Sequence, residues 1–166
     1  MSNFLINLEK SKSFDKRLSL LFNFEPFPSG EMLDASIALV LDKAKYGEHF
    51  AQIAYMCEIH KISDLKIISK CASKCIEHPQ QTAKVLRSLF VNGFGDECRS
   101  LWLEKVEYYK NLHISFYAQI LSFGLWFPET KDDANRLISE FLSGDPEARE
   151  YEELTIEPPL PTYNFI

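Results

Sequence analysis

The amino-acid sequence predicts an all-α fold: stacked antiparallel helical hairpins in an α-solenoid-like array, or an irregular helical bundle, with about eight helices. Apolar residues recur at i, i+3, i+4 and i+7 between well-spread glycines and prolines, as on helices with one buried face. No segment shows a convincing strand pattern. A short block also recurs at residues 50–54, 82–86 and 117–121, so its copies lie 32 and 35 residues apart. Those spacings suit a helical repeat unit.

The helix signals give the order of the elements. Residues 3–24 form one or two short helices with Ser13 as an N-cap, and residues 25–30 form a loop. Ser29 caps the next helix, Gly47 ends it, and Phe50 lies on the helix that follows. The later helices are expected to start at Asp64, Pro79, Asp96, His113 and Thr130. Thr130 is expected to form a capping box with Asp133.

The helix that starts at Pro79 shows a well-defined buried face. Its inward residues are expected to be Thr82, Val85, Leu86, Leu89 and Phe90, and Gly93 stops it. No expected helix interior contains proline, which would cost about 3 kcal/mol. The pattern therefore predicts helices that each bury one apolar face against their neighbours.

Two regions differ in composition. Residues 1–145 are expected to form a single all-α domain, with an N-terminal helical segment at 1–28 and the hairpins at 29–145. Residues 146–166 are acidic and contain prolines, which predicts an extended or disordered tail. Its aromatic end, residues 163–166, is expected to dock either on this domain or on a partner, and we favour its own domain.

The bulk composition restricts the class of protein. A chain of 166 residues with 46% hydrophobic residues can bury a core without metals or disulfides. The absence of a signal-peptide pattern and of a long apolar run predicts a cytoplasmic protein with reduced cysteines and no membrane span. The net charge of −6 argues against nucleic acid and anionic lipid, and it suits a basic protein partner. No cofactor is expected.

A cysteine and histidine cluster is the sharpest candidate for chemistry. Its members are Cys57, His60, Cys71, Cys75 and His78, whose spacings place them along faces of two neighbouring helices. Two antiparallel helices could then hold zinc, which binds thiolate and imidazole. The favoured interpretation is different: the cysteines lie in apolar stripes and pack as small hydrophobic residues. The histidines lie near helix ends, where His60 and His78 are expected to interact with the last carbonyl groups.

Other catalytic and binding signals are weak. The sequence contains neither a G-x-S-x-G nor an H-E-x-x-H motif, so an enzyme is less expected than a binding protein. Lys66, Lys70 and Lys74 are spaced by four and form a basic stripe that keeps a nucleic-acid-binding role as a further alternative. A solvated helix face is the simpler explanation.

The leading hypothesis is a small protein–protein interaction module. It could be an inhibitor or immunity-type protein that binds a basic effector, or an adaptor, because stacked hairpins present extended binding surfaces. Exposed aromatic residues are typical binding anchors. The candidates for partner binding are Tyr108, Tyr109, Trp126, Phe127, Tyr163 and Phe165.

Overall fold

The all-α prediction is confirmed by the computed structural model, which describes residues 2–159. These residues form nine α-helices and two 3-10 helices and contain no strand, so the count slightly exceeds the expected eight. The elements are α1 (Asn3–Lys10), α2 (Phe14–Phe22), α3 (Gly30–Lys43), α4 (Gly47–Ile59), α5 (Leu65–Lys74), α6 (Pro79–Val91), α7 (Gly95–Lys110), α8 (Ile114–Phe123), η1 (Gly124–Trp126), α9 (Lys131–Gly144) and η2 (Ala148–Thr155).

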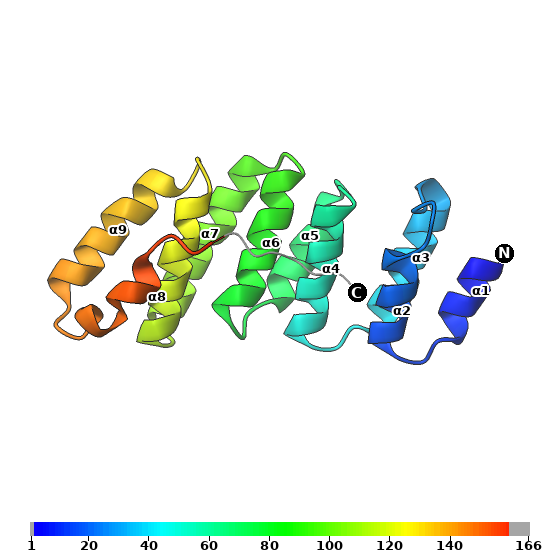
Figure 1. Ribbon diagram of the computed structural model, residues 1–166, viewed down its shortest axis with the longest axis horizontal. Coiled ribbons are helices and arrows are strands. Elements are labelled where there is room, and N and C mark those ends of the chain that lie inside the picture. Colours follow the sequence, from blue (N-terminus) through cyan, green and yellow to red (C-terminus); the bar gives the residue numbers. More distant parts are fainter. Residues whose placement is uncertain (1, 160–166) are drawn as a thin grey trace.

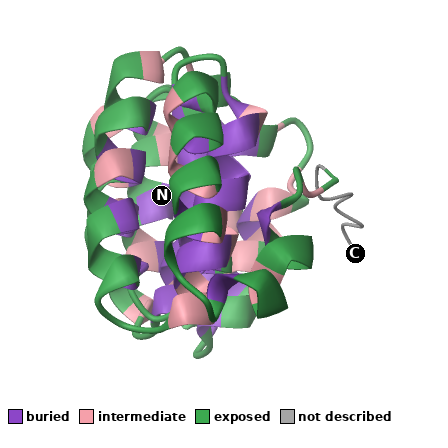
Figure 2. Cartoon of the chain, turned by 90° about the vertical axis from the view of Figure 1, so that its left-hand side faces the viewer, coloured by how far each residue is buried: buried purple, intermediate pink, exposed green. Residues whose placement is uncertain are grey.

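The helices stand side by side in a row that runs from α1 at one end to α9 at the other, and successive helices are antiparallel (Figure 1). Alternate helices form an inner row, in which α4 packs on α6 and α6 on α8. The outer helices α5, α7 and α9 pack on these inner ones. The buried residues lie mainly on the parts of the helices that face the interior of the array (Figure 2). This is the stacked-hairpin arrangement, with hairpins α4/α5, α6/α7 and α8/α9, and each recurring sequence block lies on the first helix of a hairpin.

The turn after α4 closes with a left-handed residue. The Ile62 amide donates to the carbonyl of Cys57 at 2.9 Å, which spans the last turn of the helix. Lys61 lies between them with φ of 52°, the one non-glycine residue with positive φ among the described residues. This geometry is the Schellman motif, whose left-handed position favours glycine.

The turn after α6 repeats that geometry 32 residues later. The Phe94 amide donates to the carbonyl of Leu89 at 2.9 Å, and Gly93 takes the left-handed position with φ of 85°. The two turns are also joined, because the Asn92 side-chain amide donates to the Cys57 carbonyl at 3.1 Å. The repeat therefore extends from sequence to backbone conformation.

The expected helix caps are partly confirmed. The Ser13 and Asp64 side chains accept amide hydrogen bonds at the starts of α2 and α5. Ser29 makes no side-chain cap, and the capping box at Thr130 is wrong. The Thr130 hydroxyl donates instead to the carbonyl of Gly124 at 2.5 Å, and this bond holds the turn between η1 and α9.

Gly47 starts α4 instead of ending the helix before it. The preceding helix α3 ends at Lys43, with Ala44 as its C-cap. A Cβ atom at position 47 would lie 3.0 Å from the Lys74 carbonyl oxygen and 2.7 Å from the Gln81 amide oxygen. Glycine therefore permits the close approach of α4 to the ends of its neighbours.

The tail differs from the expected extended chain. Ala148–Thr155 forms η2, which packs against α8 and α9 and takes the place of a next inner helix. Ala148 and Thr155 are buried, and the indole of Trp126 donates to the carbonyl of Pro158 at 2.6 Å. Residues 160–166 lie outside the described part of the chain.

Candidate partner-binding surface

Several outer helices begin with acidic side chains and end with a lysine. At the edge drawn uppermost in Figure 1, the outer helices begin, and their first turns hold Asp96 and Glu97 in α7 and Asp132 and Asp133 in α9. At the lower edge, α3, α5 and α7 end with a lysine in the last turn. Both arrangements complement the helix dipole. The hairpin architecture therefore produces an acidic upper edge.

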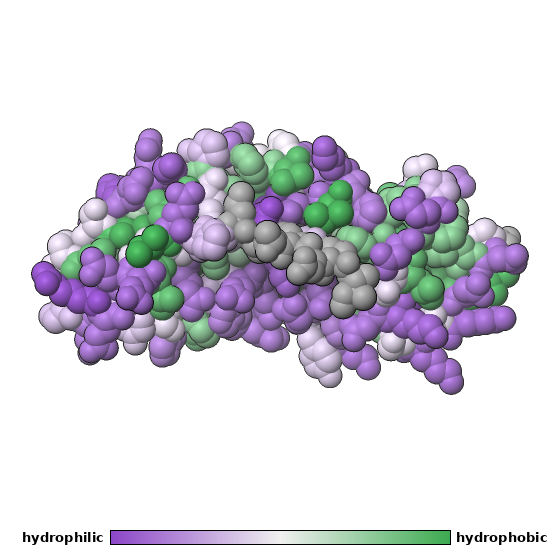
Figure 3. Space-filling model, in the orientation of Figure 1, coloured by the Kyte–Doolittle hydropathy of each residue, from purple (hydrophilic) through white to green (hydrophobic). Residues whose placement is uncertain are grey.

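Apolar side chains are exposed on this acidic edge. Ile59 at the end of α4 is 43% exposed, and Phe90 and Val91 at the end of α6 are 39% and 41% exposed. We call these three residues the upper apolar surface. Hydrophobic side chains gather over the upper ends of α4 and α6 in Figure 3. Ile59 and Val91 are 32 residues apart, so they occupy equivalent positions in consecutive hairpins.

A buried ion pair supports the upper apolar surface. The Arg87 guanidinium lies 3.1 Å from the Glu58 carboxylate, and Glu58 is 5% exposed. Arg87, Phe90 and Val91 are at i, i+3 and i+4 of α6 and therefore share one face. Burial raises the pKa of Glu58, and the charge of Arg87 opposes that shift. The pair joins α6 to α4 directly beside the apolar side chains.

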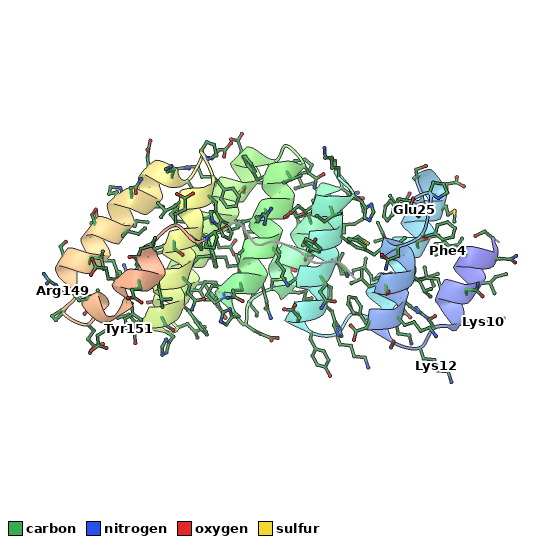
Figure 4. The ribbon with its side chains drawn as sticks, in the orientation of Figure 1. Phe4, Lys10, Lys12, Glu25, Arg149 and Tyr151 are labelled. Carbon is green, nitrogen blue, oxygen red and sulfur yellow. The ribbon has the colours of Figure 1, made fainter. Side chains whose placement is uncertain are left out.

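An aromatic stack borders the surface on the side of α2. The His60 ring stacks on Phe27 with 3.6 Å between centroids, and its Nε2 lies 3.2 Å from the carbonyl oxygen of Phe22. Burial lowers the pKa of His60, while the Phe22 hydrogen bond and the charge of Glu25 act in the opposite direction. Glu25 lies in the loop between α2 and α3 (Figure 4). This stack fixes the loop beside the end of α4.

The structure divides the predicted aromatic anchors. Tyr109 and Phe127 are buried, and the Tyr109 hydroxyl is hydrogen-bonded to Thr82 at 3.0 Å. Trp126 is half-buried near the upper edge, whereas Tyr108 is 39% exposed near the lower end of α7. Tyr108 and Trp126 therefore do not form one site. Tyr163 and Phe165 lie outside the described residues.

The cysteines of the candidate metal cluster are core residues. Cys57, Cys71 and Cys75 are buried, and the Cys75 thiol donates to the carbonyl of Gly47 at 3.4 Å. Burial raises the pKa of each thiol, to about 12 for Cys57 and Cys75. Neutral buried thiols are poor ligands and poor nucleophiles.

The histidines of that cluster have other partners. His60 belongs to the aromatic stack, and His78 caps the start of α6 by accepting the Gln80 amide at Nδ1, 3.1 Å away. The expectation that His78 lies at a helix C-terminus is therefore wrong, because the chain turns before this residue. The His78 ring also contacts Phe116. Within residues 2–159, no three His, Cys, Asp or Glu side chains are grouped so that they could hold a metal ion.

The lysine stripe lies on the outer side of the row. Lys66, Lys70 and Lys74 are exposed along α5. The neighbouring groove between α5 and α7 is lined by apolar side chains such as Ala72 and Leu101, together with the acidic Glu97 and Glu104 and the basic Lys105. Mixed charges of this kind are typical of a solvated helix face.

Sequence analysis missed the upper apolar surface because it assigned Phe90 to the core together with Thr82, Val85, Leu86 and Leu89. Those four residues are buried, but Phe90 is partly exposed at the end of α6. Its ring packs against that of Phe127, with 5.4 Å between the ring centroids. The signal that could have found the surface is the repeat itself, since Ile59 and Val91 recur just before equivalent turns.

Among the described helices, none is long and apolar enough to cross a membrane. No protein-family model, no curated protein and no solved structure matches this chain.

Proposed function

We propose that this chain is a small helical-repeat protein that binds another protein through the upper apolar surface. The observation that carries the proposal is the pairing of Ile59 and Val91 at equivalent positions of adjacent hairpins, both exposed, with Phe90 beside them. Apolar side chains gathered on an exposed edge are typical of interaction sites. The inner row of helices gives that edge a rigid support.

The charge around the surface indicates the chemistry of the partner. The Asp96 and Glu97 side chains lie in the first turn of α7, which begins four residues after Val91. Asp64 caps α5, beside the end of α4. A partner segment with apolar side chains flanked by lysine or arginine complements this arrangement. The net charge of −6 acts in the same direction at longer range.

An inhibitor of a basic effector and an adaptor would both use such a surface. Both predict the same contact and differ in what happens to the partner, since an inhibitor abolishes the partner's activity and an adaptor leaves it active. An activity assay of the captured partner, with and without this protein, separates the two.

Affinity capture tests the proposal. The tagged full chain is expressed in its native cells, and proteins bound in stoichiometric amounts are identified by mass spectrometry. The test variant is Ile59→Ser/Phe90→Ser, and the matched control is Tyr46→Ser, which removes a 63% exposed aromatic ring from the lower edge. We expect the double variant to lose the partner and the control to retain it. Equal capture by all three proteins would contradict the proposal.

A further inference from the structure

The groove between α5 and α7 is lined by apolar side chains from three helices. Ala72 of α5, Leu89 of α6 and Leu101 of α7 contribute to it, and its volume is about 450 Å³. That volume is within the range of roughly 300–1,000 Å³ that is typical of ligand sites. Ser69 and Ser100 also line the groove, and neither hydroxyl group is hydrogen-bonded within residues 2–159. The groove therefore offers apolar contacts and hydroxyl groups to a ligand.

Lys105 differs from the solvated charges around the groove. It is the one buried lysine among the described residues, with 6% of its surface exposed, whereas Lys66, Lys70 and Lys74 of α5 are exposed. Its Nζ lies 5.2 Å from the centroid of the Tyr108 ring, and it forms neither an ion pair nor a hydrogen bond in the described part of the chain. Buried charges are normally paired, because an unpaired ammonium group loses its hydration without compensation. A carboxylate bound in the groove would supply the missing acceptor.

The groove also carries negative charge. Asp96, Glu97 and Glu104 are exposed and line it together with Lys105. Three carboxylates around a single ammonium group disfavour a phosphate or another multiply charged anion. They favour a ligand that brings one carboxylate to Lys105 and a lysine or arginine side chain to Glu97.

The separation of these charges fits an extended peptide. Glu97 lies eight residues before Lys105, which is about 12 Å along α7. One extended residue covers at most about 3.6 Å, so a free amino acid is too short and three to four residues are needed. Leu101 lies midway between the two charges on the same face of α7, so the middle of the peptide meets an apolar side chain.

We infer that the groove between α5 and α7 binds an extended peptide segment in which an aspartate or glutamate lies about three residues from a lysine or arginine. The carboxylate accepts hydrogen bonds from the Lys105 ammonium group, and the basic side chain lies beside Glu97. The hydroxyl groups of Ser69 and Ser100 donate to peptide carbonyls. This site is separate from the upper apolar surface at the ends of α4 and α6, so the inference does not depend on the proposed function.

Peptide selection tests the inference. A phage-displayed library of random heptapeptides is selected on the full chain, and the enriched peptides are synthesised and titrated by isothermal titration calorimetry. Lys105→Met removes the charge but keeps a long side chain, and Glu97→Gln removes the exposed carboxylate. The matched control is Lys70→Met, which makes the same change at an exposed lysine. Ile59→Ser/Phe90→Ser separates this groove from the upper apolar surface, and circular dichroism shows whether each variant is folded.

The enriched peptides are expected to carry an acidic and a basic residue about three positions apart. Lys105→Met should weaken their binding at least about tenfold, because it removes a charge-assisted hydrogen bond. Glu97→Gln should weaken it about two- to fivefold, as for an exposed ion pair, and this variant decides the matter if Lys105→Met is not folded. Lys70→Met and Ile59→Ser/Phe90→Ser should bind like the wild type.

Three results would overturn the inference: no enriched peptide, enriched peptides without a carboxylate, or equal binding by the wild type and both groove variants. Peptides that lose binding only in Ile59→Ser/Phe90→Ser would occupy the upper apolar surface, which supports the proposed function and removes this inference. Peptide binding that depends on Lys105, without any partner captured through the upper apolar surface, would remove only the proposed function.

Discussion

Replacing Lys61 by glycine is expected to stabilise the protein. Lys61 is exposed and occupies the left-handed position of the turn after α4, with φ of 52°. In the equivalent turn after α6 that position belongs to Gly93. A residue with a Cβ atom pays about 1–2 kcal/mol for the left-handed conformation. The greater freedom of glycine in the unfolded chain cancels about 0.4–1 kcal/mol of that gain.

The net effect of Lys61→Gly is therefore a stabilisation of about 0–1.6 kcal/mol, with a middle value of about 0.8 kcal/mol, or a rise in Tm of up to roughly 6 °C for a chain of this size. Urea unfolding followed by circular dichroism measures the free energy, and thermal unfolding measures Tm. Lys70→Gly is the matched control, because it makes the same change at an exposed position inside α5 and should cost about 1 kcal/mol.

Gly93→Ala tests the same reasoning from the other direction. A Cβ atom at position 93 meets no atom within 4 Å, so the expected loss of about 1 kcal/mol or more comes from backbone conformation alone. The reasoning is refuted if Lys61→Gly destabilises the protein as much as Lys70→Gly, or if Gly93→Ala has no effect.

Three further predictions concern the core. Gly124→Ala should destabilise the protein by about 1–3 kcal/mol, because the new Cβ atom would lie 2.6 Å from Cε2 of the buried Trp102. Urea unfolding measures this loss. Gly144→Ala is the control and should not destabilise the protein, because no atom lies within 4 Å of the added Cβ atom. Arg87→Met should lower the free energy of unfolding by about 3 kcal/mol, because it leaves the buried Glu58 carboxylate without its cation. The double variant Arg87→Met/Glu58→Gln should recover part of this loss. The four cysteine thiols, whose pKa values are raised by burial, should resist a disulfide reagent at pH 8 in the folded protein and react fully in denaturant. Rapid reaction of the folded protein would contradict their burial.

Helix periodicity was sufficient to predict the class of fold and the order of its hairpins. The copies at residues 50–54, 82–86 and 117–121 lie on α4, α6 and α8, and Asp64 caps α5 as expected. These features depend on local sequence, since apolar spacing and capping residues act within a few turns. The choice between a stacked array and an irregular bundle depends on contacts between helices, which local patterns do not determine.

The candidate site was less accessible to sequence reasoning. Phe90 belongs to the apolar stripe of α6, and its exposure results from its place at the end of the inner row, beside Phe127. η2 was missed because the five glutamates between residues 147 and 157 resemble a disordered tail, whereas its packing depends on Ala148 and Thr155. In both cases a tertiary contact overrides the local composition.

The affinity of the purified partner for three proteins tests the central claim most directly. Isothermal titration calorimetry would compare the wild-type chain, Ile59→Ser/Phe90→Ser and the lower-edge control Tyr46→Ser. We predict that the double variant binds at least about tenfold more weakly and that the control binds like the wild type, because anchors of this kind contribute more than 1 kcal/mol each. Unchanged affinity in the double variant, or an equal loss in Tyr46→Ser, would contradict the assignment of partner binding to the upper apolar surface.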